Sequence, residues 1–147
     1  MTQAIRLRRA ILATLILTAI LTGSSAATAT ANTIEHTRAA RISTAKVCPV
    51  EWRKGPFFVK KLIRCAAHHY GVSADKALYV ARRESRFRPA AFNGYSCAKG
   101  IYQHLCRYWP GRAATYGFND WSAFNARANV MVTMRMVRRG GWGPWGF

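Results

Sequence analysis

Apolar residues recur every three or four positions in three stretches of this chain, and glycine or proline stands near the end of each stretch. This period is that of one face of an α-helix, whereas the alternation typical of strands is nearly absent. The pattern predicts helices over residues 56–71, 73–85 and about 122–140. We therefore expect a small, mainly α domain.

Turn-forming residues are concentrated between the second and the last of these helices. They predict loops over residues 89–100 and around residues 117–120. Residues 101–108 lie between the two loops, and their composition predicts a short helix that ends at Pro110 and Gly111.

The first 31 residues have the pattern of a secretory signal peptide. Three arginines precede an apolar run over residues 10–21, and small residues that suit a cleavage site follow it. The run is shorter than the roughly 20 residues that span a bilayer as a helix. We expect residues 1–31 to be a removed leader, residues 32–47 a flexible lead-in and residues 48–147 one folded domain. The product would be a secreted, cell-wall-associated protein without a transmembrane anchor.

Four cysteines, Cys48, Cys65, Cys97 and Cys106, lie in the expected domain. An even number of cysteines in a small exported protein is typical of disulfides, and four cysteines allow three pairings. Short loops favour Cys48 with Cys65 and Cys97 with Cys106, but the sequence leaves the pairing open. Zinc ligation is disfavoured because no two cysteines have the tight spacing of a zinc site.

The chain is strongly basic, with 23 lysines and arginines against five acidic residues and a net charge of +18. Removal of the leader leaves 20 basic side chains and a charge of +15. Such a charge attracts polyanions, which outside a cell include anionic cell-wall polymers. Nucleic acid would be bound without sequence specificity, because no nucleic-acid-binding module is recognisable.

Glu84 is one of the five acidic residues and stands among arginines. On a helix it extends an apolar stripe, while the adjacent Arg83 points about 100° away. Partial burial and the negative end of the helix dipole both disfavour the ionised form of a carboxyl group, as a general acid requires. The alternative is an exposed glutamate that pairs with Arg88.

Four short pieces of sequence follow one another in a suggestive order. They are residues 70–75 (Tyr-Gly-Val-Ser-Ala-Asp), 81–89 (Ala-Arg-Arg-Glu-Ser-Arg-Phe-Arg-Pro), 98–103 (Ala-Lys-Gly-Ile-Tyr-Gln) and 124–130 (Phe-Asn-Ala-Arg-Ala-Asn-Val). Together they resemble the soluble lytic transglycosylase family, over roughly residues 57–138. The resemblance implies a lysozyme-like helical fold with a catalytic glutamate at the end of a helix. It also implies cleavage of the β-1,4 bond between N-acetylmuramic acid and N-acetylglucosamine in peptidoglycan.

The resemblance implies roles for five residues. Glu84 matches the family's catalytic acid, and Ser85 matches the hydroxyl beside it, which helps to orient the carboxyl group or a sugar. Gln103 matches a glutamine that lines the sugar groove, and Asn129 matches the asparagine of the last helix. Tyr102 stands where the family commonly has methionine, and a ring there can stack on a sugar face.

The end of the chain departs from this family, whose members usually carry a Tyr-Asn pair near the catalytic acid. Residues 140–147 instead read Gly-Gly-Trp-Gly-Pro-Trp-Gly-Phe, which resembles the end of the resuscitation-promoting factors, related lysozyme-like muralytic proteins. We expect most aromatic side chains to be core; if any stack on sugars, Trp142 and Trp145 are the best candidates, because their surroundings are rich in glycine. We expect His104 at a solvated helix position.

The reaction outcome depends on a second carboxylate, because ordinary glycosidases use a pair. Asp120 is the best candidate for such a partner. With so few acids we favour Glu84 acting first as acid and then as base, while the muramyl 6-hydroxyl attacks C1 to give a 1,6-anhydro product, without metal or cofactor. The alternatives are a lysozyme-type or resuscitation-promoting-factor-like muramidase, and a non-catalytic cationic cell-wall-binding or antimicrobial protein. In each case we expect a monomer whose partner is the glycan strand of peptidoglycan.

Overall fold

The computed structural model describes residues 47–147 and, in the preceding part of the chain, only Glu35, an exposed helical residue. The predicted leader and almost all of the predicted lead-in lie outside the described residues. The chain divides into the units Met1–Arg38 and Ala39–Phe147, and the fold below is that of the second unit. Among the described residues, no helix has the length and apolar character needed to cross a membrane.

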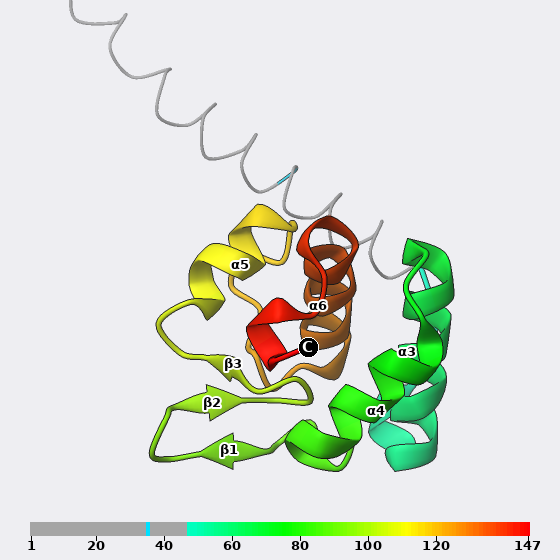
Figure 1. The fold of residues 1–147 in the computed structure, drawn as a ribbon, viewed down its shortest axis with the longest axis horizontal. Helices are drawn as coiled ribbons and strands as arrows, with labels where there is room; N and C mark the ends of the chain where they lie inside the picture. Colours follow the sequence, from blue (N-terminus) through cyan, green and yellow to red (C-terminus); the bar gives the residue numbers. More distant parts are fainter. Residues whose placement is uncertain (1–34, 36–46) are drawn as a thin grey trace, which may run out of the picture. The chain divides into compact units, whose positions relative to one another are not determined.

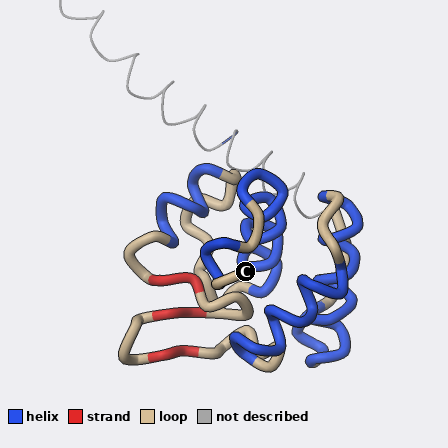
Figure 2. Tube along the Cα trace, in the orientation of Figure 1, coloured by secondary structure: helices blue, strands red, loops and turns tan. Residues whose placement is uncertain are grey.

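The described domain is mainly α, as predicted, and Figures 1 and 2 show its elements. Three predicted helices are confirmed as α3 (Pro56–Tyr70), α4 (Ala74–Ser85) and α6 (Ala126–Gly140). Their ends follow from local chemistry. The hydroxyl of Ser73 accepts a hydrogen bond from the Lys76 backbone amide at the start of α4, and Gly71 ends α3 with a positive φ of 66°.

The predicted short helix over residues 101–108 is wrong. That segment contains turns and the strand β3 (His104–Leu105), and the helix α5 (Trp109–Thr115) begins where the predicted helix was to end. Pro110 lies in the first turn of α5, where the missing N–H of proline costs no hydrogen bond. Pro110 therefore lies at the start of α5, whereas the sequence pattern predicted that it would end a helix over residues 101–108.

A small antiparallel sheet, which the sequence pattern did not predict, lies between α4 and α5 in the chain. It consists of β1 (Phe92–Asn93), β2 (Ala98–Lys99) and β3, in the order β1-β2-β3. Each strand has two residues, which is too short for an alternating pattern to be visible in the sequence. In Figure 1 the turn that joins β2 to β3 lies on the side of the sheet towards α4, and the turn that joins β1 to β2 lies at the opposite end.

Two disulfides have the pairing that short loops favoured. Cys48 bonds to Cys65, which fixes the segment before α3 to that helix, and Cys97 bonds to Cys106, which joins the two ends of the β2–β3 hairpin. Loops of these lengths, 17 and 9 residues, correspond to about 3 kcal/mol of stabilisation each.

Helix α6 is the centre of the core and lies between α5 and α3 in Figure 1. Its side chains from Ala128 to Met134 are all buried, so most of its circumference faces protein. Helix α3 packs against both α6 and α4. Leu62 and Ile63 of α3 are fully buried, which is worth about 1.5–3 kcal/mol for each side chain.

The C-terminal segment, which includes the 3-10 helix η2 (Gly143–Trp145), is held on the domain by Trp145. The indole Nε1 of Trp145 donates to the Tyr102 carbonyl at 2.8 Å, and the side chain is buried. Phe147 contacts Tyr79 of α4 edge-to-face. This segment therefore joins the region around β3 to α4.

Candidate active site

A cleft of about 400 Å³ lies among α4, the small sheet, α5 and the C-terminal segment. It combines a single carboxylate with two guanidinium groups and several uncharged polar side chains. The lining residues are Arg83, Glu84, Asn93, Ser96, Ala98, Gln103, Leu105, Arg112, Pro144 and Trp145. A wider hollow of about 640 Å³ has walls of arginines and aromatic rings without carboxylate or amide groups, so the first cleft is the better candidate for chemistry.

Glu84 occupies the last turn of α4, one residue before the helix ends. Ala77, Val80 and Ala81 are fully buried, so the predicted apolar stripe exists and Glu84 extends it towards the cleft. Its side chain is 22% exposed. Glu84 thus has the position expected of a catalytic acid: half-buried, with access to a cleft.

The expected separation of Glu84 from its neighbouring charges is wrong for Arg83. The Arg83 side chain donates to Glu84 Oε1 from Nη2 at 2.9 Å and from Nε at 3.2 Å. Arg88, the alternative partner, donates instead to the Ser85 carbonyl. Helix geometry fixes only the direction in which the Arg83 side chain leaves the helix, and an arginine side chain is long enough to bend back to the next residue.

Arg83 also connects α4 to the C-terminal segment, because its Nη2 donates to the Trp145 carbonyl. Its guanidinium lies 4.2 Å from the centre of the Phe147 ring. Both hydrogen bonds to Glu84 end on Oε1, and Oε2 has no hydrogen-bond partner among the described residues. One carboxylate oxygen is therefore fixed, and the other is left for a ligand.

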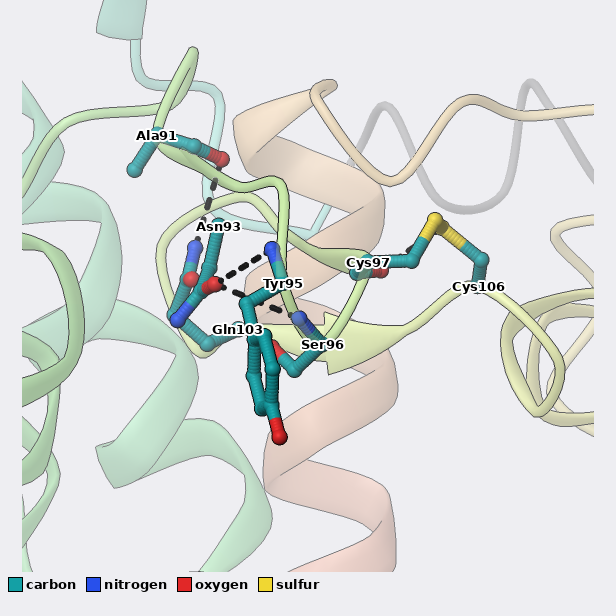
Figure 3. The surroundings of a disulfide bond; sticks show 7 residues. All are labelled: Ala91, Asn93, Tyr95, Ser96, Cys97, Gln103 and Cys106. Carbon is teal, nitrogen blue, oxygen red and sulfur yellow. Dashed lines mark hydrogen bonds between the residues drawn. A yellow bond between two sulfur atoms is a disulfide. The ribbon is translucent and has the colours of Figure 1, made fainter.

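Gln103 lines the same cleft and is held by two backbone carbonyls, of which Figure 3 shows that of Ala91. Its Nε2 donates to the Gly100 carbonyl at 2.8 Å and to the Ala91 carbonyl at 3.2 Å. Two carbonyl partners use both amide hydrogens, so the amide oxygen is the atom that can accept a hydrogen bond from a ligand. The backbone φ of 48° places Gln103 in the left-handed region, a conformation that non-glycine residues adopt at a cost.

The turn between β1 and β2 supplies polar groups beside Gln103 (Figure 3). Asn93 Oδ1 accepts hydrogen bonds from the backbone amides of Tyr95 and Ser96, which fixes the turn. Asn93 and Ser96 line the cleft, and the Tyr95 ring is fully exposed. Their turn-forming composition predicts only a loop here, without a role in the site.

Tyr102 and Ser85 lie in the protein interior rather than in the cleft. The Tyr102 ring is fully buried and its hydroxyl donates to the Ala77 carbonyl, so the ring is not available to stack on a sugar. Burial also raises the pKa of the Tyr102 hydroxyl well above its ordinary value. Ser85 is buried and donates to the Ala81 carbonyl in its own helix, away from Glu84.

Asn129 is also buried and supports the wall of the cleft from behind. Its Oδ1 accepts from the Tyr102 backbone amide at 2.9 Å, and its Nδ2 donates to the Ala123 carbonyl at 2.8 Å and to the Lys99 carbonyl at 3.3 Å. These bonds join α6 to the segment that ends in Gln103. Asn129 therefore positions the site without lining it.

His104 is buried, contrary to the expectation of a solvated helix position. Its Nδ1 lies 2.9 Å from Arg112 Nη1, and its Nε2 lies 2.8 Å from Thr133 Oγ1. Burial, and then the charge of Arg112, lower the pKa of His104 to about 3. The imidazole is consequently neutral at physiological pH and serves as a fixed support for Arg112.

Within residues 47–147, the other acidic side chains do not line the cleft. Asp75 is in the first turn of α4 and Glu51 pairs with Arg53 at 3.7 Å, while Asp120 is exposed. Asp120, the predicted second carboxylate, is not among the lining residues. Within residues 47–147 and Glu35, no group of three or more His, Cys, Asp or Glu side chains is arranged to hold a metal ion.

Arg83 and Arg112 line the site although the sequence pattern does not predict a role for either residue. Arg83 is next to Glu84 in the sequence, but whether its guanidinium contacts Glu84 depends on the side-chain conformation, which the sequence does not give. Arg112 is far from the motifs and carries no local pattern that distinguishes it from the other arginines.

Comparisons with family models, with curated proteins and with solved structures give no match for this chain.

Proposed function

We propose that this protein is a peptidoglycan lytic transglycosylase that cleaves the β-1,4 bond between N-acetylmuramic acid and N-acetylglucosamine. The observation that carries the proposal is that Glu84 and Gln103 line the same cleft. Glu84 lies there at the end of α4, a helix whose apolar face is buried. The resemblance of the sequence motifs names the same two residues. The basic charge of the chain suits an anionic cell-wall partner.

In the proposed reaction, Glu84 donates a proton to the glycosidic oxygen as the bond from that oxygen to the muramyl C1 breaks. The resulting carboxylate then takes the proton of the muramyl 6-hydroxyl, and O6 bonds to C1. The products are a free 4-hydroxyl on one sugar and a 1,6-anhydro ring on the other. No water is consumed, and Glu84 regains its proton.

The arrangement of acids supports this route over hydrolysis. Inverting and retaining glycosidases use a second carboxyl group about 5–9.5 Å from the first. Glu84 is the only acidic side chain among the residues that line the cleft. In the one-carboxylate route the substrate's own hydroxyl replaces the missing nucleophile. Gln103, through its amide oxygen, would accept a hydrogen bond from a sugar hydroxyl or N–H group.

The test compares the wild-type protein with Glu84→Gln on purified insoluble peptidoglycan. We expect the wild type to release soluble muropeptides lighter by one water than the hydrolysed products, and Glu84→Gln to be at least about 100-fold slower. Glu51→Gln and Asp75→Asn remove the same charge outside the cleft and should cleave like the wild type. Equal release by the wild type and Glu84→Gln would contradict the proposal. Products with reducing ends, together with loss of activity in Asp120→Asn, would identify a hydrolase.

A second function, non-catalytic binding of cell walls, is favoured by one observation. The Arg83–Glu84 ion pair already occupies the oxygen Oε1 of the one carboxylate that lines the cleft. In that case the wild type and Glu84→Gln would both sediment with peptidoglycan, and neither would release soluble products. The same experiment therefore separates the two functions.

A further inference from the structure

Arg112 projects into the cleft from α5 and is held there by a chain of hydrogen bonds. A guanidinium group can only donate, so His104 Nδ1 must accept from Arg112, and the imidazole proton must lie on Nε2. Nε2 then donates to Thr133 Oγ1, and the Thr133 hydroxyl donates to the Asn129 carbonyl at 2.8 Å. The direction of every bond in this chain is fixed by the arginine.

Arg112 has no carboxylate partner in the part of the chain that the structure describes. The ion pairs found there join Glu51 to Arg53 and Glu84 to Arg83. Arg112 is nevertheless half-buried, and this burial lowers its pKa. The guanidinium carbon also lies 5.3 Å from the centre of the Tyr108 ring. A partly desolvated cation without a counter-ion is unfavourable, and an anionic ligand would offset that cost.

The cleft therefore carries an unmatched positive charge. Glu84 is already paired with Arg83, so the second guanidinium is left over. His104 uses one of the five N–H groups of Arg112, which leaves a donor edge for a planar acceptor. An arginine fixed on one side binds a carboxylate with less loss of side-chain freedom than a mobile lysine does.

We propose that Arg112 recognises a carboxylate of the substrate in the cleft that holds Glu84. The inference rests on the proposed function for the identity of the substrate. Peptidoglycan offers this chemistry from two sources: the lactyl carboxylate of a muramyl residue without a peptide, and a carboxylate of the peptide stem. Arg112 would select glycan that carries such a group over neutral N-acetylglucosamine polymer. Its role is binding, while Glu84 carries the chemistry.

The experiment measures binding by NMR titration of the intact protein, so it does not depend on turnover. The ligands are N-acetylmuramic acid, its neutral methyl ester and N-acetylmuramyl-L-alanyl-D-isoglutamine, whose only carboxylate lies in the peptide. We expect the wild type to bind at least one of the two acids about 10- to 100-fold more tightly than the ester. The better of the two acids identifies the source of the carboxylate.

Variants then assign the preference to a residue. Arg112→Gln should bind the favoured acid and the ester equally, and Arg112→Lys should keep part of the preference. Arg107→Gln removes a positive charge from the exposed residue before Tyr108, outside the cleft, and should behave like the wild type. Equal binding of acids and ester by the wild type overturns the inference even if a variant fails to fold, and so does a full preference in folded Arg112→Gln.

The two proposals can fail separately. If the carboxylate preference depends on Arg112 but Glu84→Gln cleaves peptidoglycan as fast as the wild type, the cleft is an anion site and the proposed catalytic role is wrong. If cleavage depends on Glu84 but the wild type binds the acids and the ester equally, the proposed enzymatic function stands and the proposed role of Arg112 in carboxylate binding is wrong.

Discussion

The side-chain amide of Asn129 occupies the space that a β-carbon at Gly100 would need. A β-carbon built at Gly100 would overlap both Asn129 Nδ2 and the Ala123 carbonyl oxygen, and the Gly100 φ of 80° is in the left-handed region. Asn129 can approach the backbone of residues 99–102 only because residue 100 has no side chain. This close approach sets the backbone that presents Gln103 to the cleft.

Gly100→Ala should therefore destabilise the protein by at least about 3 kcal/mol, since it adds a steric overlap to an unfavourable φ. The free energy of unfolding from urea titration measures this change. Gly111→Ala is the matched control, because a β-carbon at Gly111 in α5 meets nothing within 4 Å. That control should be neutral or more stable by up to about 1 kcal/mol. Similar losses in both variants would contradict the steric argument.

Asn129→Ala should also cost at least about 3 kcal/mol, for a different reason. It leaves the Tyr102 amide and the carbonyls of Lys99 and Ala123 without their side-chain partner in a buried region. If Asn129 acts only through the fold, binding of N-acetylmuramic acid by the folded fraction at low temperature should change less than stability does. A variant of wild-type stability that has lost sugar binding would instead indicate direct contact with substrate.

The sequence predicted the helices well because their determinants are local. The Ser73 cap, the proline at the start of α3 and the buried spacing of α4 each act within a turn or two of the chain. The segment over residues 101–108 failed because its conformation depends on distant partners. Asn129 binds the Tyr102 amide across 27 positions, and Trp145 binds the Tyr102 carbonyl across 43.

The same distinction applies to the site. Motif resemblance identified Glu84 and Gln103, which line the cleft, but it also named Tyr102 and Asn129, which are buried behind it. A motif records which residues occur together and not whether they face solvent or the core. Arg112 entered the site through α5, a helix that the sequence pattern placed elsewhere.

The buried His104 predicts a particular dependence of stability on pH. Its pKa is about 3 in the folded protein, whereas the ordinary value for histidine is 6.5. Between these two pH values the unfolded chain binds a proton at His104 and the folded protein does not. Stability from this residue is therefore present above pH 6.5 and is lost as the pH falls towards 3. Between pH 6.5 and pH 5 the free energy of unfolding should fall by about 1.5 kcal/mol.

Urea titrations at several pH values between 7 and 5 test the assignment to His104. The pH dependence should become shallower in His104→Gln, which does not titrate in this range. His68 is exposed on α3, so His68→Gln should keep the wild-type dependence. An unchanged slope in folded His104→Gln would show that another group takes up the proton.

The two disulfides should differ in what their removal does to the cleft. Replacing either pair by alanine should cost about 3 kcal/mol, because both close loops of similar entropic cost. Cys97 and Cys106 flank the hairpin that contributes Ala98, Gln103 and Leu105 to the cleft, whereas the other disulfide ties the segment before α3. Well below the melting temperature, loss of Cys97–Cys106 should weaken binding of N-acetylmuramic acid several-fold. Loss of Cys48–Cys65 should leave binding unchanged, and equal effects on binding would mean that the hairpin keeps its shape without its disulfide.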